Sequence, residues 1–244
     1  MGAIAPALAR LALAASVLAA LLLPSGLTLW NGTPPATDVQ QRVRAYTDAK
    51  GIVLLGENEV PLTLERAVVA TEDERFYTHH GIDSIGIGRS LLYDVTNLCL
   101  CQGGSTITQQ LVKDLYLGGS DRGRNKVEGM VLALKVERTI TKHQIMADYL
   151  SEITTGFGVF GVTAAACVYY SAPLSNLTLG QYALLAGVTQ APSIYDPRVN
   201  PDAAAARRAH VLDAMVSDRY ITSAQAVAAK AEPVLARGVG RPGC

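Results

Sequence analysis

The chain has 244 residues, and its 21 Lys and Arg residues balance 21 Asp and Glu residues to a formal net charge of zero. Charged residues make up 17% of the sequence, below the roughly 25% of soluble domains, and the mean hydropathy is +0.22. This composition excludes extensive intrinsic disorder, and the charge balance argues against a nucleic-acid partner, which needs a local excess of cations. Few aromatic residues favour helices over a β-sandwich.

The beginning of the chain is uncharged over a long stretch. Residues 11–37 carry no charged side chain, and residues 7–29 in helical form would span one hydrocarbon thickness, roughly 30 Å. Arg10 lies on the amino-terminal side and favours a cytoplasmic amino terminus. We therefore predict a transmembrane anchor over residues 1–30, in the cytoplasmic membrane, with the rest of the chain on the extracytoplasmic face. A cleaved signal peptide is the alternative.

The remaining chain divides into a linker at residues 31–50, one domain at residues 51–239 and a short tail at residues 240–244. Four cysteines allow three full pairings in an oxidising compartment, and they equally suit small core residues plus one loose thiol. No second closely spaced Cys or His pair is present, so we expect no metal site made of these residues. The cysteines are Cys99, Cys101, Cys167 and Cys244.

In chain order, the first predicted element is a short strand at residues 51–55. Apolar spacing then predicts a helix over residues 63–76, capped by Thr63. Residues 86–100 are rich in Ile, Leu and Tyr. They predict either a mobile apolar flap that dips into lipid or a plain core helix.

A Thr-x-x-Gln pattern recurs four times ahead of apolar periodic runs, and it is typical of a capping box. We therefore predict helix starts at Thr106, Thr141, Thr178 and Thr222, and a fifth at Asn200-Pro201. Residues 127–140 form another amphipathic stretch, and Gly156, Gly158 and Gly161 interrupt the chain. Strand-like alternation is scarce, so the domain is predicted to be all-α.

Glu72 is the first candidate for chemistry. It follows Val68 by four residues on the same helical face, so its carboxylate would point toward apolar surroundings. A carboxylate at the edge of an apolar face, with cations nearby, is a candidate general base. The alternative is a solvated acidic helix end.

Two further patterns suit a phosphate. Residues 103–110, Gly-Gly-Ser-Thr-Ile-Thr-Gln-Gln, place free backbone amides and hydroxyls at a capped helix start, without the Lys-Ser/Thr ending of a nucleotide P-loop. A basic cluster follows, with Glu128 close behind it, and could neutralise a pyrophosphate. An ordinary turn and a solvated surface are the alternatives. The cluster consists of Lys113, Arg122, Arg124 and Lys126.

Together these segments resemble the peptidoglycan glycosyltransferases, the family 51 glycosyltransferases. Residues 72–83 match the first signature, Glu-Asp-x-x-Phe-x-x-His-x-Gly, and residues 103–110 match the second signature at every position. Residues 142–150 and 177–197 are similar to later segments of the family. The order and the spacing agree from about Val60 to Ala229.

The resemblance implies a lysozyme-like, all-α catalytic domain behind a single membrane anchor. Such enzymes polymerise lipid II into glycan strands by inverting transfer, with release of undecaprenyl pyrophosphate. By this similarity Glu72 is the general base and Glu128 the candidate second carboxylate. The substrate-binding residues would be Asp73, Phe76, His79, Gly103, Gly104, Ser105, Thr106, Gln109, Gln110, Lys113, Arg122, Arg124 and Lys126.

The same resemblance bears on cofactors and partners. A divalent ion such as Mg²⁺ is allowed as an aid to pyrophosphate departure. The expected partners are lipid II, the growing glycan strand and the membrane. Only about 15 residues follow Ala229 in this sequence. The chain is therefore similar to a monofunctional transglycosylase, which leaves room for a separate transpeptidase as a further partner.

The third family signature, Arg-Lys-x-x-Glu, is altered. Read without a gap, its Arg falls on Asn125 and its Glu on Gly129. Glu128 is one residue away, about 100° off on a helix. This departure motivates an alternative, a lipid II or glycan-binding homologue with impaired catalysis. A lysozyme-like glycan-cleaving enzyme is a third hypothesis, and residues 103–110 argue against it because cleaving finished glycan needs no pyrophosphate site.

Overall fold

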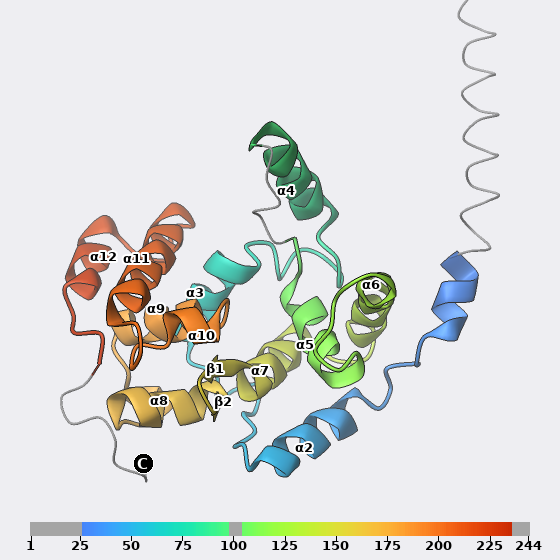
Figure 1. Ribbon diagram of the computed structural model, residues 1–244, viewed down its shortest axis with the longest axis horizontal. Helices are drawn as coiled ribbons and strands as arrows, with labels where there is room; N and C mark the ends of the chain where they lie inside the picture. The colour runs from blue at the N-terminus through green and yellow to red at the C-terminus, as the bar shows by residue number, and fades with distance from the viewer. Residues whose placement is uncertain (1–25, 98–103, 236–244) are drawn as a thin grey trace, which may run out of the picture.

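The computed structural model describes residues 26–97 and 104–235, and they are mostly helical (Figure 1). Residues 26–32 are helical and precede the named elements. The elements are α2 (Val39–Lys50), α3 (Leu62–Glu72), α4 (Ser84–Asn97), α5 (Ile107–Tyr116), α6 (Arg124–Val136), α7 (Lys142–Glu152), β1 (Thr154–Gly156), β2 (Val159–Phe160), α8 (Val162–Tyr170), a 3-10 turn (Leu174–Asn176), α9 (Leu179–Val188), α10 (Pro192–Tyr195), α11 (Pro201–Ser217) and α12 (Ser223–Lys230).

Two groups of helices make up the domain. On one side α3, α9 and α11 pack against one another, with α12 outside them, and on the other side α5 packs against α6 and α7 (Figure 1). One continuous apolar core runs through both groups, and Phe76, Tyr149 and Tyr169 are its largest fully buried side chains. The end of α3 and the start of α5 therefore meet between the two groups.

The helix starts predicted from the Thr-x-x-Gln pattern and from Asn200-Pro201 are confirmed. Full capping boxes open α5, α9 and α12, and Thr141 caps α7 by accepting a hydrogen bond from the Gln144 amide. Helix α11 begins at Pro201 as predicted, but the Asn200 side chain makes no cap bond and donates to the Ile194 carbonyl instead.

Other boundaries differ from the prediction. Helix α3 begins at Leu62, after Pro61, and not at Thr63, and it ends at Glu72 instead of continuing to Phe76. Proline fixes an extended entry without needing a side-chain cap. Residues 52–56 are irregular and form no strand. The stretch of residues 156–161, whose glycines were expected to interrupt the chain, contributes to a small antiparallel hairpin of β1 and β2.

The stretch expected as a linker is partly ordered. Helix α2 buries Val39, Val43 and Thr47 and packs against α5 and α7. Ahead of it, the Lys135 ammonium group at the end of α6 donates to the carbonyls of Trp30, Thr33 and Pro34 at 2.7, 2.8 and 3.0 Å. Residues 30–50 are thus attached to the domain, because the Lys135 side chain and the apolar side chains of α2 that make these contacts are buried.

Several sequence predictions lie outside the described residues: the anchor up to residue 25, Gly103 and the tail at residues 240–244. Within residues 26–97 and 104–235, no helix has the length and apolar character needed to cross a bilayer. Cys167 is disulfide-bonded, and the other three cysteines fall outside these ranges.

Helix α4 covers most of the segment predicted to be either a flap or a core helix. It stands away from both helix groups (Figure 1), and Ile85, Leu92 and Val95 on it face solvent, with Leu92 65% and Val95 63% exposed. The core-helix alternative is therefore wrong for the described part of the segment. Its last predicted residues, 98–100, are not described.

Candidate active site

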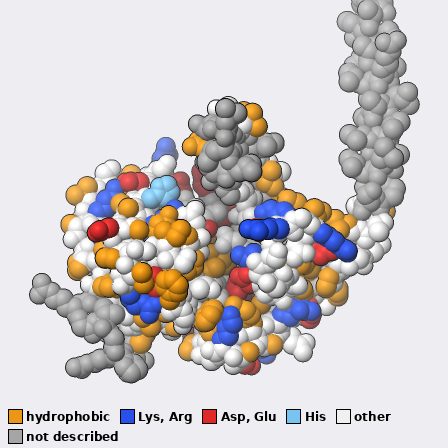
Figure 2. Space-filling view, in the orientation of Figure 1, with side chains coloured by type: hydrophobic (Ala, Val, Ile, Leu, Met, Phe, Trp, Pro, Cys, Tyr) orange, Lys and Arg blue, Asp and Glu red, His pale blue; other side chains and the backbone are white. Residues whose placement is uncertain are grey.

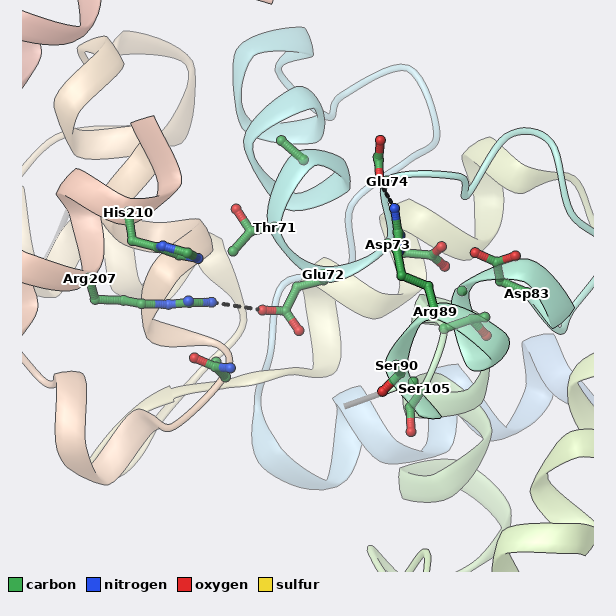
Figure 3. Close-up of a pocket in the computed structure, with 15 residues that line it drawn as sticks. Thr71, Glu72, Asp73, Glu74, Asp83, Arg89, Ser90, Ser105, Arg207 and His210 are labelled. Atoms are coloured by element: carbon green, nitrogen blue, oxygen red, sulfur yellow. Dashed lines mark hydrogen bonds and ion pairs between the residues drawn. The ribbon is translucent and has the colours of Figure 1, made fainter. Parts of the chain in front are cut away.

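Glu72 is the last residue of α3 and lies at the junction of the two helix groups. Leu64, Val68 and Glu72 follow one another at intervals of four and share the buried face of the helix. The Glu72 side chain is accordingly only 9% exposed. Its carboxylate nevertheless lines a cleft of about 520 Å³ (Figure 3).

Two side chains from other helices hold this carboxylate. Gln110 on α5 donates from Nε2 to Oε2 at 3.2 Å. Arg207 on α11 donates from Nη2 to Oε1 at 3.3 Å (Figure 3). Burial raises the pKa of Glu72 above its ordinary value, whereas Gln110 and Arg207 oppose this rise by stabilising the charged form. A carboxylate with a raised pKa is a stronger base than an exposed one, which suits proton abstraction.

The residue after Glu72 is used structurally. Both oxygens of Asp73 lie 2.9 Å from His79 Nε2, and Oδ2 also accepts the Ile107 amide at 3.0 Å. His79 Nδ1 faces the Lys142 ammonium group at 3.4 Å, so Nε2 carries the ring proton that Asp73 accepts. Asp73 thereby fixes the end of α3 against the start of α5.

The start of α5 is held by its own capping box. The Thr106 hydroxyl accepts the Gln109 amide and donates to the Gly81 carbonyl at 2.8 Å, while Gln109 Oε1 accepts the Thr106 amide at 2.9 Å. Gln110, the next residue, is then directed toward Glu72. The signature segment therefore builds a rigid helix start as well as a polar surface.

The main cleft combines predicted and unpredicted residues. Of the predicted ones, Glu72, Asp73, Gly104, Ser105 and Thr106 line it. Sequence reasoning missed the others that carry polar side chains, Thr71, Glu74, Asp83, Arg89, Ser90, Gln190, Arg207 and His210.

A second, smaller cleft of about 160 Å³ adjoins the first, and Ser105 lines both. Two cations reach it, Lys113 from α5 and Lys126 from α6, and Lys126 Nζ donates to Ser105 Oγ at 2.5 Å. Gln109 and Gln110 line it as well. Figure 2 shows Lys and Arg side chains gathered over α6, beside the hollow between the helix groups. This arrangement suits a diphosphate next to the Glu72 cleft.

Five predicted residues that the structure describes line neither cleft, namely Phe76, His79, Arg122, Arg124 and Glu128. Glu128 accepts a hydrogen bond from Arg124 Nε at 2.6 Å along α6, and Gly129, one residue on, lines the small cleft in its place. Arg122 is exposed, and Phe76 is fully buried in the core. The positions of these residues therefore do not support the predicted roles in substrate binding or catalysis.

Arg207 had a usable signal in the sequence. Helix α11 buries Ala204, Arg207, Val211 and Met215, so this arginine interrupts an apolar stripe. A charged residue on a buried helical face needs a buried partner. The partner, Glu72, lies 135 residues earlier in the chain and cannot be found by local spacing.

The donor set was compared with the needs of a divalent ion. Mg²⁺ prefers carboxylate and other oxygen ligands, usually one or two carboxylates with waters and substrate phosphates. The small cleft offers one carboxylate, Asp121, which lies 3.7 Å from Lys126. In the part of the chain that the structure describes, no cluster of three or more His, Cys, Asp or Glu side chains is suited to a metal. These residues do not fit an ion held by the protein.

Comparison with known proteins adds to this geometry. Residues 40–216 match the family model described as transglycosylase. The chain is 40% identical over 196 residues to penicillin-binding protein 1A of Vibrio cholerae, covering 77% of this chain and 24% of that protein. Penicillin-binding protein 1F of Bacillus subtilis is 37% identical over 185 residues, covering 76% and 26%. The chain thus spans about a quarter of the length of these curated relatives.

Among solved structures, the chain is similar to a crystal structure of penicillin-binding protein 1A from Haemophilus influenzae. The TM-score is 0.44 at 25% sequence identity, and the similarity covers 76% of this chain and 18% of that one.

Proposed function

The chain belongs to the transglycosylase family, and on that premise we propose that it is a peptidoglycan glycosyltransferase that polymerises lipid II. The observation that carries the proposal is the buried Glu72 carboxylate, held by Gln110 and Arg207 in a cleft that continues into a lysine-lined one. An acid-base group beside a cationic pocket is what glycosyl transfer from a diphosphate donor requires.

In the proposed reaction Glu72 takes the proton from the 4-hydroxyl of the acceptor sugar. The freed oxygen attacks the anomeric carbon of the donor, the bond to the pyrophosphate breaks, and the configuration inverts from α to β. The Glu72 side chain suits this step because burial strengthens it as a base while Arg207 keeps it oriented. A positioned base of this kind contributes on the order of 10²–10⁴-fold to the rate.

The pyrophosphate leaves with its electron pair and needs stabilisation by positive charge. Lys113 and Lys126 line the small cleft, and Ser105 connects it to the main cleft. Fixed cations in a confined cleft stabilise developing negative charge more strongly than cations in bulk water. We assign the lipid-linked diphosphate to this small cleft and the acceptor sugar to the main one. The lysozyme-like character of the fold is part of the same proposal.

The lipid substrate also requires contact with a bilayer. We propose that residues 1–30 anchor the chain, with the domain on the extracytoplasmic face, and that α4 dips into the lipid. The exposed Leu92 and Val95 side chains support the second point, because apolar side chains on a projecting helix partition into a bilayer interface.

The proposed lipid contact is measurable by tryptophan fluorescence. In a Trp30→Phe background, the full chain in vesicles would carry Leu92→Trp, with Val227→Trp on α12 as the control at a similarly exposed apolar position. Brominated lipids should quench the first probe and not the second. Equal quenching of the two probes, or quenching of neither, would reject the contact for α4.

The catalytic proposal is tested by lipid II polymerisation followed on gels. The full chain should form glycan polymer, and Glu72→Gln, which keeps the shape of the side chain but is not a base, should lose at least 10²-fold in rate, on the order expected for a lost base. A folded wild-type protein that makes no polymer from lipid II would overturn the proposal.

A second candidate is a lipid II binding homologue with impaired catalysis. The observation that favours it is Gly129, which brings no side chain to the small cleft while Glu128 turns toward Arg124. This candidate predicts lipid II binding without polymer, and binding unchanged by Glu72→Gln. A glycan-cleaving enzyme would instead release soluble muropeptides from cell-wall sacculi.

A further inference from the structure

Glu72 is connected to a buried tyrosine through one glutamine. Gln110 Nε2 donates to Glu72 Oε2 at 3.2 Å, and on its other side Gln110 Oε1 accepts the hydroxyl of Tyr149 at 3.2 Å. Tyr149 belongs to α7 and is fully buried, one of the largest buried side chains of the core. The phenol is therefore held rigidly behind the glutamine.

The direction of each hydrogen bond follows from the groups present. An ionised carboxylate accepts and cannot donate, so the amide nitrogen of Gln110 must face Glu72. The amide oxygen then faces Tyr149, whose hydroxyl must donate to it. If the amide turned by 180°, its oxygen would face the charged carboxylate and its NH₂ group the phenol. Tyr149 supports the orientation that the ionised carboxylate requires, because its hydroxyl donates to the amide oxygen turned toward it.

We propose that Tyr149 is a positioning residue that keeps the Gln110 amide turned so that its NH₂ group faces Glu72, and thereby keeps Glu72 available as a base. This inference rests on the proposed function of Glu72, and it adds a role that neither signature segment contains. Tyr149 touches neither cleft. Its hydrogen-bond connection to the carboxylate runs through Gln110.

The consequence of losing the phenol hydroxyl has a definite sign. In Tyr149→Phe the amide is free to turn its oxygen toward Glu72, where it accepts a hydrogen bond only from the protonated carboxyl group. This bond stabilises the protonated form of Glu72, whereas the ionised form loses the hydrogen bond that Gln110 donated to it. A higher pH is therefore needed to ionise Glu72. The acid limb of the pH–rate profile should therefore move upward. At high pH, where Glu72 is ionised again, the rate should recover.

The experiment compares pH profiles of lipid II polymerisation for the wild-type full chain and Tyr149→Phe. On the acid limb the variant should be about tenfold slower, the equivalent of about 1.4 kcal/mol, and on the high-pH plateau it should lie within about threefold of wild type. Tyr170→Phe is the matched control, because the Tyr170 hydroxyl is buried without a hydrogen-bond partner among the described residues. It should leave the profile unchanged.

A double-mutant comparison separates positioning from general support of the fold. In a Gln110→Ala background Tyr149→Phe should add no further shift of the acid limb, because the amide that transmits the effect is gone. The same shift in both backgrounds, an unmoved acid limb, or a loss that is equal at every pH would overturn the inference.

A second readout does not depend on activity. NMR titration of ¹³C-labelled glutamate carboxyl groups, with the Glu72 signal assigned by its absence in Glu72→Gln, should show Glu72 protonated at a higher pH in Tyr149→Phe than in wild type. If wild type forms no polymer, the proposed function fails and this titration alone decides the inference. Identical titration curves in the two proteins would overturn it.

Discussion

The end of α3 and the beginning of α6 each carry a glutamate that the sequence marks for catalysis, yet the two side chains have opposite surroundings. Glu72 is held by Gln110 and Arg207 at the wall of the main cleft. Glu128 lies one turn into α6 and pairs with Arg124, whose side chain is 82% exposed. The Glu72 carboxylate is enclosed by the domain, and the Glu128 side chain, 20% exposed, pairs with a solvent-facing arginine.

The two glutamates also differ in where they lie relative to the buried face of their helix. On α3, Glu72 follows Leu64 and Val68 at intervals of four, so it lies on the face that packs into the core. On α6 the buried positions are Gly129, Val131, Leu132, Ala133, Lys135 and Val136, and Glu128, 20% exposed, lies at the edge of that buried face. Gly123, with a φ of 56°, starts α6 in a conformation that favours glycine. Glu72 therefore lies within the buried face of its helix, whereas Glu128 lies at the edge of the buried face of α6.

The largest predicted effect is the contrast between the two glutamates. Glu72→Gln should slow lipid II polymerisation by at least 10²-fold, on the order of a lost base. Glu128→Gln should change it by less than about threefold, since a surface pair of this kind contributes about 0.3–0.5 kcal/mol. Initial rates of both variants at neutral pH, with thermal unfolding as a control for folding, provide the measurement. Comparable losses of rate in the two variants would show that Glu128 is as important for catalysis as Glu72.

The sequence predicted what local interactions decide. Each Thr-x-x-Gln capping pattern started a helix, because its bonds join residues three apart. The burial of Glu72 was predictable in the same way, from its spacing after Val68. Those inferences needed no knowledge of where the other helices lie.

Long-range partners were beyond the reach of the same reasoning. Arg207 meets Glu72 across 135 residues and Tyr149 meets Gln110 across 39, and no local spacing encodes either contact. Helix α2 was missed because its few buried residues are hidden among polar ones. The position of Arg207 in an apolar stripe would have indicated that it has a buried partner, without identifying that partner.

Two cations on α6 allow a test of whether positive charge in the small cleft supports catalysis. Lys126 lines this cleft and bonds to Ser105, whereas Arg124, two residues earlier, points into solvent. Lys126→Met should lower the rate on the order of 10²-fold, as expected for losing a group that stabilises developing charge. Arg124→Met should have little effect. Rates measured at two salt concentrations would check this, and a larger loss in Arg124→Met would assign the diphosphate elsewhere on α6.

A further prediction concerns the effect of Arg207 on the pH dependence of catalysis by Glu72. Replacing it by Gln removes a positive charge that favours ionised Glu72, while the burial that raises the pKa of Glu72 remains. The pKa of Glu72 should rise further, and the rate at a pH on the acid limb should fall about tenfold for each 1.36 kcal/mol lost. Recovery at higher pH is expected in the pH–rate profile. A loss that is the same at every pH would mean that Arg207 acts on the substrate instead.

The smallest predicted effect concerns a third glutamate, Glu152, which is buried like Glu72 but lacks its partners. It is 1% exposed, and neither of its oxygens has a hydrogen-bond partner among the described residues, so burial holds the pKa of Glu152 well above its ordinary value. The folded state then binds this proton more tightly than the unfolded state.

The stability that the Glu152 proton contributes is fully present below the ordinary glutamate pKa of about 4.3, and it is lost as pH rises through the folded-state value. Glu152→Met removes this loss and should increase the free energy of unfolding at neutral pH by about 1–3 kcal/mol, the cost of an unsatisfied buried group. Urea unfolding at pH 5 and pH 8 should give a gain over wild type that grows with pH. Because Glu152 lines neither cleft, polymerisation should be unaffected, in contrast to Glu72→Gln. A variant less stable than wild type at pH 8 would show that neighbouring groups stabilise the buried Glu152 carboxylate, as they do for Glu72.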